Sequence, residues 1–199
     1  MQGQSKDGSD AELVRLTLAG NEQAFTGLMS RHKAWLFRFI RRYVGNNEDA
    51  LDLLQDTLVS TWQALHRYDP ERPFAAWLRQ IALNKCRDWG RRSLLRGVVS
   101  YLSGDIDDVP AEMPASDPEA LLATDQALRC LDDAIASLPL RLREPLILTV
   151  FEGLSQREAA ELLRVSEKSI ETRVYRARKQ LARAIENVGL REQHEETSP

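Results

Sequence analysis

The sequence predicts an all-α protein built from two small helical domains joined by a flexible acidic linker. Apolar residues recur every three to four positions along most of the chain, which is the spacing of a helix face. Strand-like alternation of apolar and polar residues does not extend over any length. Residues 1–102 carry 15 basic and 11 acidic side chains, residues 103–136 carry 1 and 9, and residues 137–191 carry 11 and 7. Two basic blocks therefore flank an acidic segment.

The composition excludes several classes of protein. The 199 residues suit one mid-sized domain or two small ones. We expect neither membrane insertion nor a secretion signal, because no run of ~18 uncharged apolar residues occurs and the N-terminus has no apolar stretch. Cys86 and Cys130 lie outside any metal-binding spacing, which predicts no metal site, no cofactor and a reducing, cytoplasmic location.

Two helices are predicted at the start of the chain. Asp10 caps a short helix over 11–19, which ends at Gly20. Asn21 caps a longer helix, which ends at Gly45 because glycine readily adopts the left-handed conformation after a helix.

The third predicted helix begins at Asn46 or Asn47 and carries an acidic face. Its predicted buried face consists of Ala50, Leu53, Leu54, Leu58, Thr61, Trp62 and Leu65. Asp49, Asp52 and Asp56 share another side, and like charges at this spacing destabilise a helix when no basic residue compensates them. The acidic face predicts a basic protein partner, with a merely solvated surface as the alternative.

A fourth helix is predicted from Pro73 to about Arg92. Its apolar side consists of Phe74, Trp77, Leu78, Ile81 and Trp89. Its other side carries Arg79, Gln80, Asn84, Arg87 and Arg91. Basic side chains beside aromatic ones suit the capture of unstacked bases on single-stranded DNA, although an ordinary solvated face has a similar composition.

The chain composition then changes. Residues 100–119 hold three prolines and no basic residue, which predicts an extended linker because such a segment cannot bury enough apolar area to fold. Helix returns near 119–136. Another helix is predicted from about Arg141 to Phe151, where Pro145 either sits in the first turn or kinks the helix.

The last third of the chain has the pattern of a helix-turn-helix. Ser155 and Glu158 form a predicted capping box for its first helix, and Ser166 caps its second. On the second helix, the residues predicted to face the core are Ile170, Val174, Ala177 and Leu181. The opposite face carries Lys168, Glu171, Thr172, Tyr175, Arg176 and Lys179. Such side chains contact base edges and phosphates, which predicts binding to duplex DNA, with a solvated face as the alternative.

Three stretches occur in a fixed order: EDALDLLQDTLVSTWQAL, FAAWLRQIALNKCRDWGRR and SLPLRLREPLILTVFEGLSQREAAELLRVSEKSIETRVYRARKQL. Together they resemble the extracytoplasmic-function group of sigma-70 family transcription initiation factors. The resemblance covers about residues 21–92 and 131–185. It implies an N-terminal extension over 1–20, sigma region 2 over 21–95, an acidic linker over 96–130, sigma region 4 over 131–187 and an acidic tail over 188–199.

The resemblance also implies a role for each surface. The third helix would bind the beta-prime clamp of core RNA polymerase through Asp49, Asp52, Leu53, Gln55 and Asp56. The loop His66–Phe74 and the fourth helix would open and read the minus-10 element. The residues of the helix that would contact this element are Trp77, Arg79, Gln80, Asn84, Lys85, Arg87 and Arg91. The last helix would read the minus-35 element through Lys168, Glu171, Thr172, Arg173, Tyr175, Arg176 and Lys179. The helix Leu138–Phe151 would dock on the beta flap of the polymerase.

The implied protein is an alternative sigma factor that binds core polymerase and promoter DNA, is controlled by an anti-sigma factor, and has neither catalytic activity nor a small-molecule substrate. A sigma-like decoy that sequesters an anti-sigma protein is the alternative, but a decoy is expected to lose basic residues such as Arg79 and Arg176. A stand-alone helix-turn-helix repressor leaves the first hundred residues unexplained. Many family members have Lys or Arg where this chain has Glu171, so the minus-35 sequence remains open.

Overall fold

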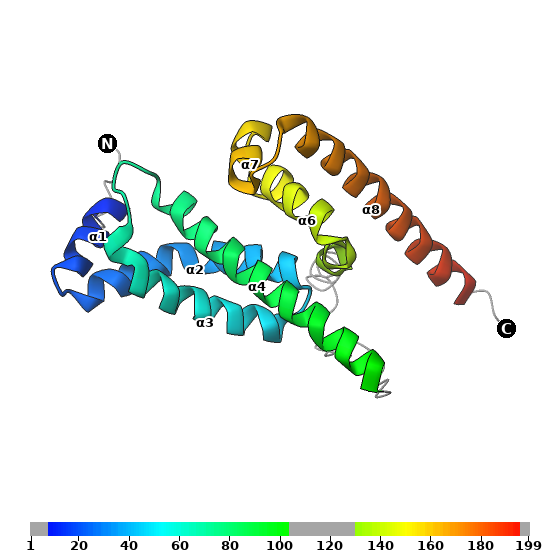
Figure 1. Ribbon diagram of the computed structural model, residues 1–199, viewed down its shortest axis with the longest axis horizontal. Helices are drawn as coiled ribbons and strands as arrows, with labels where there is room; N and C mark the ends of the chain where they lie inside the picture. The colour runs from blue at the N-terminus through cyan, green and yellow to red at the C-terminus, as the bar shows by residue number, and fades with distance from the viewer. Residues whose placement is uncertain (1–7, 104–129, 196–199) are drawn as a thin grey trace. The chain divides into compact units, whose positions relative to one another are not determined.

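The computed structural model describes residues 8–103 and 130–195, and every regular element in these ranges is a helix, as predicted (Figure 1). The elements are α1 (Asp10–Leu18), α2 (Glu22–Val44), α3 (Asn47–Ala64), η1 (Leu65–Arg67), α4 (Phe74–Ser103), α6 (Leu140–Leu146), η2 (Ile147–Phe151), α7 (Gln156–Leu163) and α8 (Glu167–Glu195), with a further helical stretch over 130–137. The chain divides into two compact units. The first consists of Met1–Ile40 and Asn47–Leu95, and the second of Arg41–Asn46 and Arg96–Pro199.

The cap of α1 is Ser9, where the sequence predicted Asp10. The Ser9 hydroxyl accepts a hydrogen bond from the N–H of Glu12 at 3.3 Å. Asp10 is instead the first residue of the helix, and its carboxylate lies 2.9 Å from Nε2 of His32 and 3.2 Å from Nη1 of Arg31. These contacts fasten α1 to α2, so the side chain of Asp10 is engaged away from the helix end.

The predicted ends of α2 are confirmed. Asn21 accepts a hydrogen bond from the N–H of Ala24 at 3.2 Å, which caps the helix. Gly45 has a φ of +92°, which an L-residue with a side chain adopts only with strain. The chain can therefore turn directly from α2 into α3.

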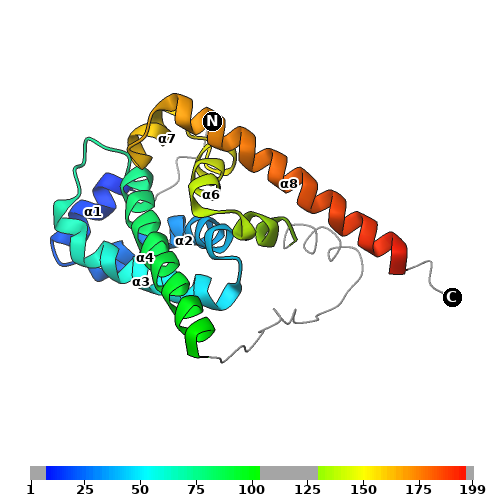
Figure 2. The ribbon, with the colours of Figure 1, turned by 45° about the vertical axis from the view of Figure 1, so that its right-hand side comes forward.

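The first unit packs α2, α3 and α4 side by side around an apolar core (Figures 1 and 2). Its fully buried side chains include Leu28, Leu36, Phe39, Ile40, Leu65, Leu78 and Leu83. Thr57 and Thr61 are also fully buried in α3, and each hydroxyl donates to the carbonyl oxygen four residues earlier, at 2.6 Å and 2.7 Å. Both hydroxyl groups are hydrogen-bonded within the helix, so the core contains no unsatisfied polar group at these two positions.

The predicted buried face of α3 is wrong at Trp62. This side chain is 45% exposed, and its ring packs edge-on against Phe25 with 4.9 Å between ring centroids. At about 100° per residue, position 62 falls between the half-buried Leu58 and the exposed Gln55, at the edge of the apolar face. Thr57, about 140° from Trp62 around the helix, is fully buried although it was not predicted on the buried face.

Helix α4 is longer than predicted. It continues to Ser103, whereas the sequence predicted an end near Arg92 and a linker from residue 96. The first proline after this helix is Pro110, so nothing in the backbone of residues 93–103 interrupts the hydrogen-bond ladder. The rest of the predicted linker, 104–129, lies outside the described residues.

In the second unit, α6 changes into the wider π-turn of η2 two residues after Pro145. The proline has no N–H, and the N–H of Glu152 then bonds to the carbonyl of Ile147, five residues back, at 3.0 Å. The hydroxyl of Thr149 donates to the carbonyl of Pro145 at 2.8 Å. The sequence allowed Pro145 either in the first turn of the helix or at a kink. In the structure, Pro145 lies inside the helix, and the helix is distorted after it.

The long helix α8 packs its N-terminal half against α6 and α7, and in both views it continues well past them (Figures 1 and 2). It ends at Glu195, so residues 188–195 of the predicted acidic tail are helical. Arg143 closes the connection before α6: it is 8% exposed, and its guanidinium donates to the carbonyl of Leu138 at 2.8 Å and 3.2 Å. Among the described residues, no helix combines the length and apolarity that crossing a bilayer requires.

Candidate functional site

The acidic face predicted on the third helix is present on α3. Asp52, Gln55 and Asp56 are exposed one helical turn apart, whereas Asp49 is half-buried. In the part of the chain that the structure describes, neither Asp52 nor Asp56 has a salt-bridge partner. Two carboxylates held four residues apart repel each other weakly, and this repulsion is relieved when a basic group approaches. The face is therefore electrostatically suited to a basic partner.

Leu53, which was grouped with these residues, lies elsewhere. It is only 4% exposed and belongs to the core of the first unit, so it supports α3 from inside and cannot contact a partner directly. Two apolar residues that the sequence analysis missed border the carboxylates instead. Leu51 is 49% exposed and Val59 is 56% exposed, and both lie one turn from Gln55. Their spacing from Gln55 was the signal that could have revealed them.

The basic face of α4 is held in place by local contacts. The guanidinium of Arg79 lies 5.3 Å from the centre of the Trp35 ring, which is close enough for a cation–π interaction. Gln80 donates to the side chain of Asn84 at 3.1 Å. Arg91 forms an ion pair with Asp88 one turn away. The remaining predicted contacts, Lys85 and Arg87, are half-buried on the same helix.

The loop before α4 is built around three aromatic rings. Tyr68, Phe74 and Trp77 lie with ring centroids 5.3–5.6 Å apart, and the hydroxyl of Tyr68 donates to the carbonyl of Arg72 at 2.6 Å. Burial raises the pKa of the Tyr68 phenol, and the nearby carboxylates of Asp10 and Asp69 raise it further. The phenol thus remains a neutral hydrogen-bond donor that fixes the loop beside Trp77.

The helix-turn-helix scaffold forms as predicted. Ser155 accepts from the N–H of Glu158 at 3.2 Å while the Glu158 carboxylate accepts from the N–H of Ser155 at 2.8 Å, which completes the capping box. Between the two helices, Arg164 has a φ of +57° and adopts the left-handed conformation. Ala159, fully buried, lets the helices approach closely at this elbow.

The reading face predicted on the last helix is open on α8. Ile170 and Ala177 are fully buried on its inner side, and Val174 and Leu181 are half-buried. The exposed or half-exposed residues on the outer side are Lys168, Glu171, Thr172, Tyr175, Arg176 and Lys179. They span about 140° of the helix surface, and Arg173 lies about 60° beyond them, at the edge of the face. Tyr175 is 67% exposed, an unusual position for a large aromatic ring.

Two side chains on this face are already oriented. The ammonium of Lys168 lies 2.7 Å from Oε2 of Glu171, and the hydroxyl of Thr172 donates to the carbonyl of Lys168 at 2.9 Å. Because its hydroxyl points back to its own helix, Thr172 presents its methyl group outward. A methyl group and a carboxylate are therefore placed next to each other in the first turns of α8.

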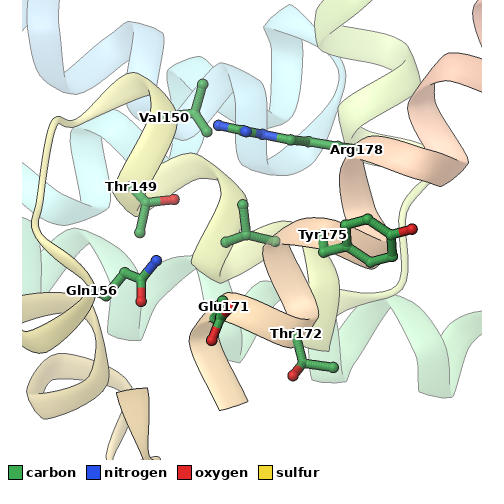
Figure 3. Close-up of a pocket in the computed structure, with 8 residues that line it drawn as sticks. Thr149, Val150, Gln156, Glu171, Thr172, Tyr175 and Arg178 are labelled. Atoms are coloured by element: carbon green, nitrogen blue, oxygen red, sulfur yellow. The ribbon is translucent and has the colours of Figure 1, made fainter. Parts of the chain in front are cut away.

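A hollow of about 460 Å³ lies beside the reading face (Figure 3). Residues from three elements surround it, and those not predicted as site residues are Thr149, Val150, Gln156, Val174 and Arg178. Gln156 is the first residue of α7, and Val150 comes from the π-turn. Gln156 could have been found from the sequence, because it directly follows the capping Ser155. No sequence signal pointed to Val150, because the exposure of its side chain depends on the π-turn.

Across residues 8–103 and 130–195, no three His, Cys, Asp or Glu side chains gather closely enough to bind a metal ion. The candidate binding side chains are instead carboxylates on α3, exposed or half-buried cations with two amides on α4, and three cations with a carboxylate, a threonine and a tyrosine on α8. This arrangement is chemically suited to binding polyanions and a basic protein surface.

Comparisons with known proteins give a consistent result. Sequence profiles of sigma-70 region 2 and sigma-70 region 4 match residues 28–96 and 128–181. The chain is 34% identical over 187 residues to the RNA polymerase sigma factor CnrH of Cupriavidus metallidurans, covering 89% of this chain and 95% of that one. It is 31% identical over 177 residues to the ECF RNA polymerase sigma factor SigM of Mycobacterium tuberculosis, covering 89% and 85%. It also resembles the sigma factor RpoE solved with the anti-sigma factor NepR from Bartonella quintana, with a TM-score of 0.63, 26% identity, and coverage of 81% and 96%.

Proposed function

Because the chain belongs to the sigma-70 family, in its extracytoplasmic-function group, we propose how its surfaces divide the work of transcription initiation. The protein is an alternative sigma factor: it binds core RNA polymerase, directs initiation at specific promoters and is controlled by an anti-sigma factor. Family members are DNA-binding initiation factors rather than enzymes. We place the protein in the cytoplasm, where its polymerase and its promoters are, and assign it no reaction of its own.

The polymerase would be bound chiefly by α3. We assign the clamp contact to Asp52, Gln55 and Asp56, with the exposed apolar side chains of Leu51 and Val59 in place of the buried Leu53. An interface that combines carboxylates with a few apolar residues gains orientation from the charges and affinity from the area that the apolar residues bury. Helix α6 with η2 would make the second contact, on the beta flap.

Promoter DNA would be bound by α4 and α8. The basic face of α4 follows the phosphates of the opened minus-10 strand, and the aromatic loop that Tyr68 fixes beside Trp77 accepts a base turned out of the stack. The reading face of α8 lies in the major groove of the minus-35 element. Residues 21–95 would thus form sigma region 2, and residues 131–187 sigma region 4.

One observation carries the proposal: two exposed carboxylates on α3, Asp52 and Asp56, which have no salt-bridge partner among the described residues, and an open face on α8 that carries Lys168, Arg176 and Lys179 occur in separate compact units. The test is run-off transcription on genomic fragments with core polymerase and the purified full-length chain. We expect start sites preceded by a shared pair of elements, and none with core alone. Core binding without initiation on any fragment would favour the decoy.

Arg176 tests the assignment of the minus-35 face. We expect Arg176→Ala to cost about 1–3 kcal/mol of holoenzyme binding to the best promoter and much less on promoters with an altered minus-35 base, because a contact to a base edge is lost. Filter binding across a set of single-base promoter variants measures this. Lys179→Ala is the matched control and should weaken binding evenly. An even loss for Arg176→Ala as well would assign Arg176 to a phosphate.

A further inference from the structure

We infer that Glu171, held by Lys168, selects cytosine at one base pair of the minus-35 element. This inference rests on the function proposed above and concerns the choice of base within it. Glu171 is the fifth residue of α8, and the first turns of a recognition helix are the part that reaches base edges. Its side chain is about half exposed, on the wall of the hollow between α8, α7 and the π-turn (Figure 3).

The chemistry of the carboxylate restricts the bases it can contact. An ionised glutamate only accepts hydrogen bonds. In the major groove, guanine presents acceptors at N7 and O6, and thymine presents an acceptor at O4. Adenine has a donor at N6, but its N7 acceptor lies beside it and repels a carboxylate. Cytosine presents the N4 amino group with no acceptor of its own in the groove, so its edge is the one that suits Glu171.

Lys168 removes the main obstacle to such a contact. A free carboxylate is repelled by the phosphates on either side of the groove, but the ammonium of Lys168 lies 2.7 Å from Oε2 of Glu171. The pair is close to neutral, and it leaves Oε1 to accept the cytosine amino group. Lys168 keeps two further N–H donors for a phosphate, since an ammonium has three. The two side chains thus act together, one on a base and the other on the backbone.

The neighbouring residues are consistent with this orientation. Thr172 and Tyr175 line the same hollow as Glu171, and Gln156 faces it from the first residue of α7. Apart from Glu171 and Arg178, the polar side chains that line the hollow are the amide of Gln156 and the hydroxyl groups of Thr149, Thr172 and Tyr175. Arg178 lines the hollow too, but from its far side, where it reaches toward Val150 (Figure 3). Lys168 is therefore the cation that orients the carboxylate.

The experiment uses holoenzyme reconstituted from core polymerase and the full-length chain, with a promoter library randomised across the minus-35 element. Transcripts from the library are sequenced. We expect one position at which C·G is enriched by about fivefold or more over the other pairs, which is the lower range for a specific base contact. Glu171→Gln should shift that position, and no other, toward A·T, because glutamine pairs with adenine through N6 and N7.

Two further variants complete the test. Lys168→Met keeps the length of the side chain without its charge and should reduce the C·G enrichment by up to about twofold, the value of such a pair, together with a general loss of binding. Glu167→Gln makes the same charge change as Glu171→Gln at the first residue of α8 and should leave the base preference unchanged. Initiation with an unaltered preference in Glu171→Gln would overturn this inference while leaving the proposed function intact. Absence of initiation from every promoter would overturn both.

Discussion

We expect the double variant Asp52→Lys/Asp56→Lys to lose core polymerase binding by a factor on the order of 100, because like charges brought together across an interface cost several kcal/mol and each 1.4 kcal/mol is tenfold. Both carboxylates are exposed on α3, and neither has an ion-pair partner within the described residues, so no internal contact is broken. Lysine is also a good helix former, which keeps α3 intact. Competition binding against a labelled reference sigma factor measures the effect.

The neutral variant Asp52→Asn/Asp56→Asn separates charge from shape. It should bind core with intermediate affinity, and the difference between it and the wild type should shrink as salt increases, because exposed charges are screened. Circular dichroism of all three proteins should be the same. If the lysine variant binds core as tightly as the wild type does, the clamp contact lies elsewhere than on α3.

Ile170→Ala should produce the largest change in stability. Ile170 is fully buried on the inner side of α8, the helix that packs against α6 and α7, and removing a buried aliphatic side chain costs about 2–5 kcal/mol. A helical unit of this size has only a few kcal/mol of stability in total. We therefore expect its melting temperature to fall by about 8 °C or more, with loss of minus-35-dependent transcription.

The positions of the tryptophans allow the unfolding of the two units to be followed separately. Trp35, Trp62, Trp77 and Trp89 all belong to the first unit, so intrinsic fluorescence follows that unit, whereas circular dichroism follows both. In Ile170→Ala the dichroism transition should move and the fluorescence transition should stay. Val174→Ala, half-buried on the same helix, should have a smaller effect. Equal shifts of both signals would mean that the two units unfold together.

Features governed by neighbours in sequence could be predicted from the sequence. The capping box of Ser155 and Glu158 and the left-handed Gly45 depend on side chains within a few residues, and both are present. The reading face of α8 follows from helical periodicity in the same way. The cap of α1 is local as well, because the hydroxyl of Ser9 accepts from the N–H of Glu12, three residues later, and the prediction of Asp10 was wrong by one residue. The contact of Asp10 with His32, 22 residues away in sequence, could not be predicted, because it depends on how α1 packs on α2.

The surface of α3 shows where periodicity is insufficient. Its apolar face is wider than the core can cover, and the packing of α2 and α4 decides which edge remains exposed. Leu53 lies inside, while Leu51, Val59 and Trp62 lie outside. Helix period places Leu51 about 200° from Leu53, on the other side of the helix, but it leaves Trp62 at the edge of the apolar face, so the exposure of Trp62 had to come from the folded unit.

The π-turn after Pro145 has a consequence for how this surface evolves. In an uninterrupted α-helix, Val150 would stand directly above Leu146 on the inward side. The extra residue in the turn shifts the phase of the helix, and Val150 is 44% exposed beside the reading helix. Deleting a single residue from this turn is expected to turn Val150 inward, toward the side of Leu146. Relatives with nearly the same amino acids can therefore present different surfaces here, through one insertion or deletion.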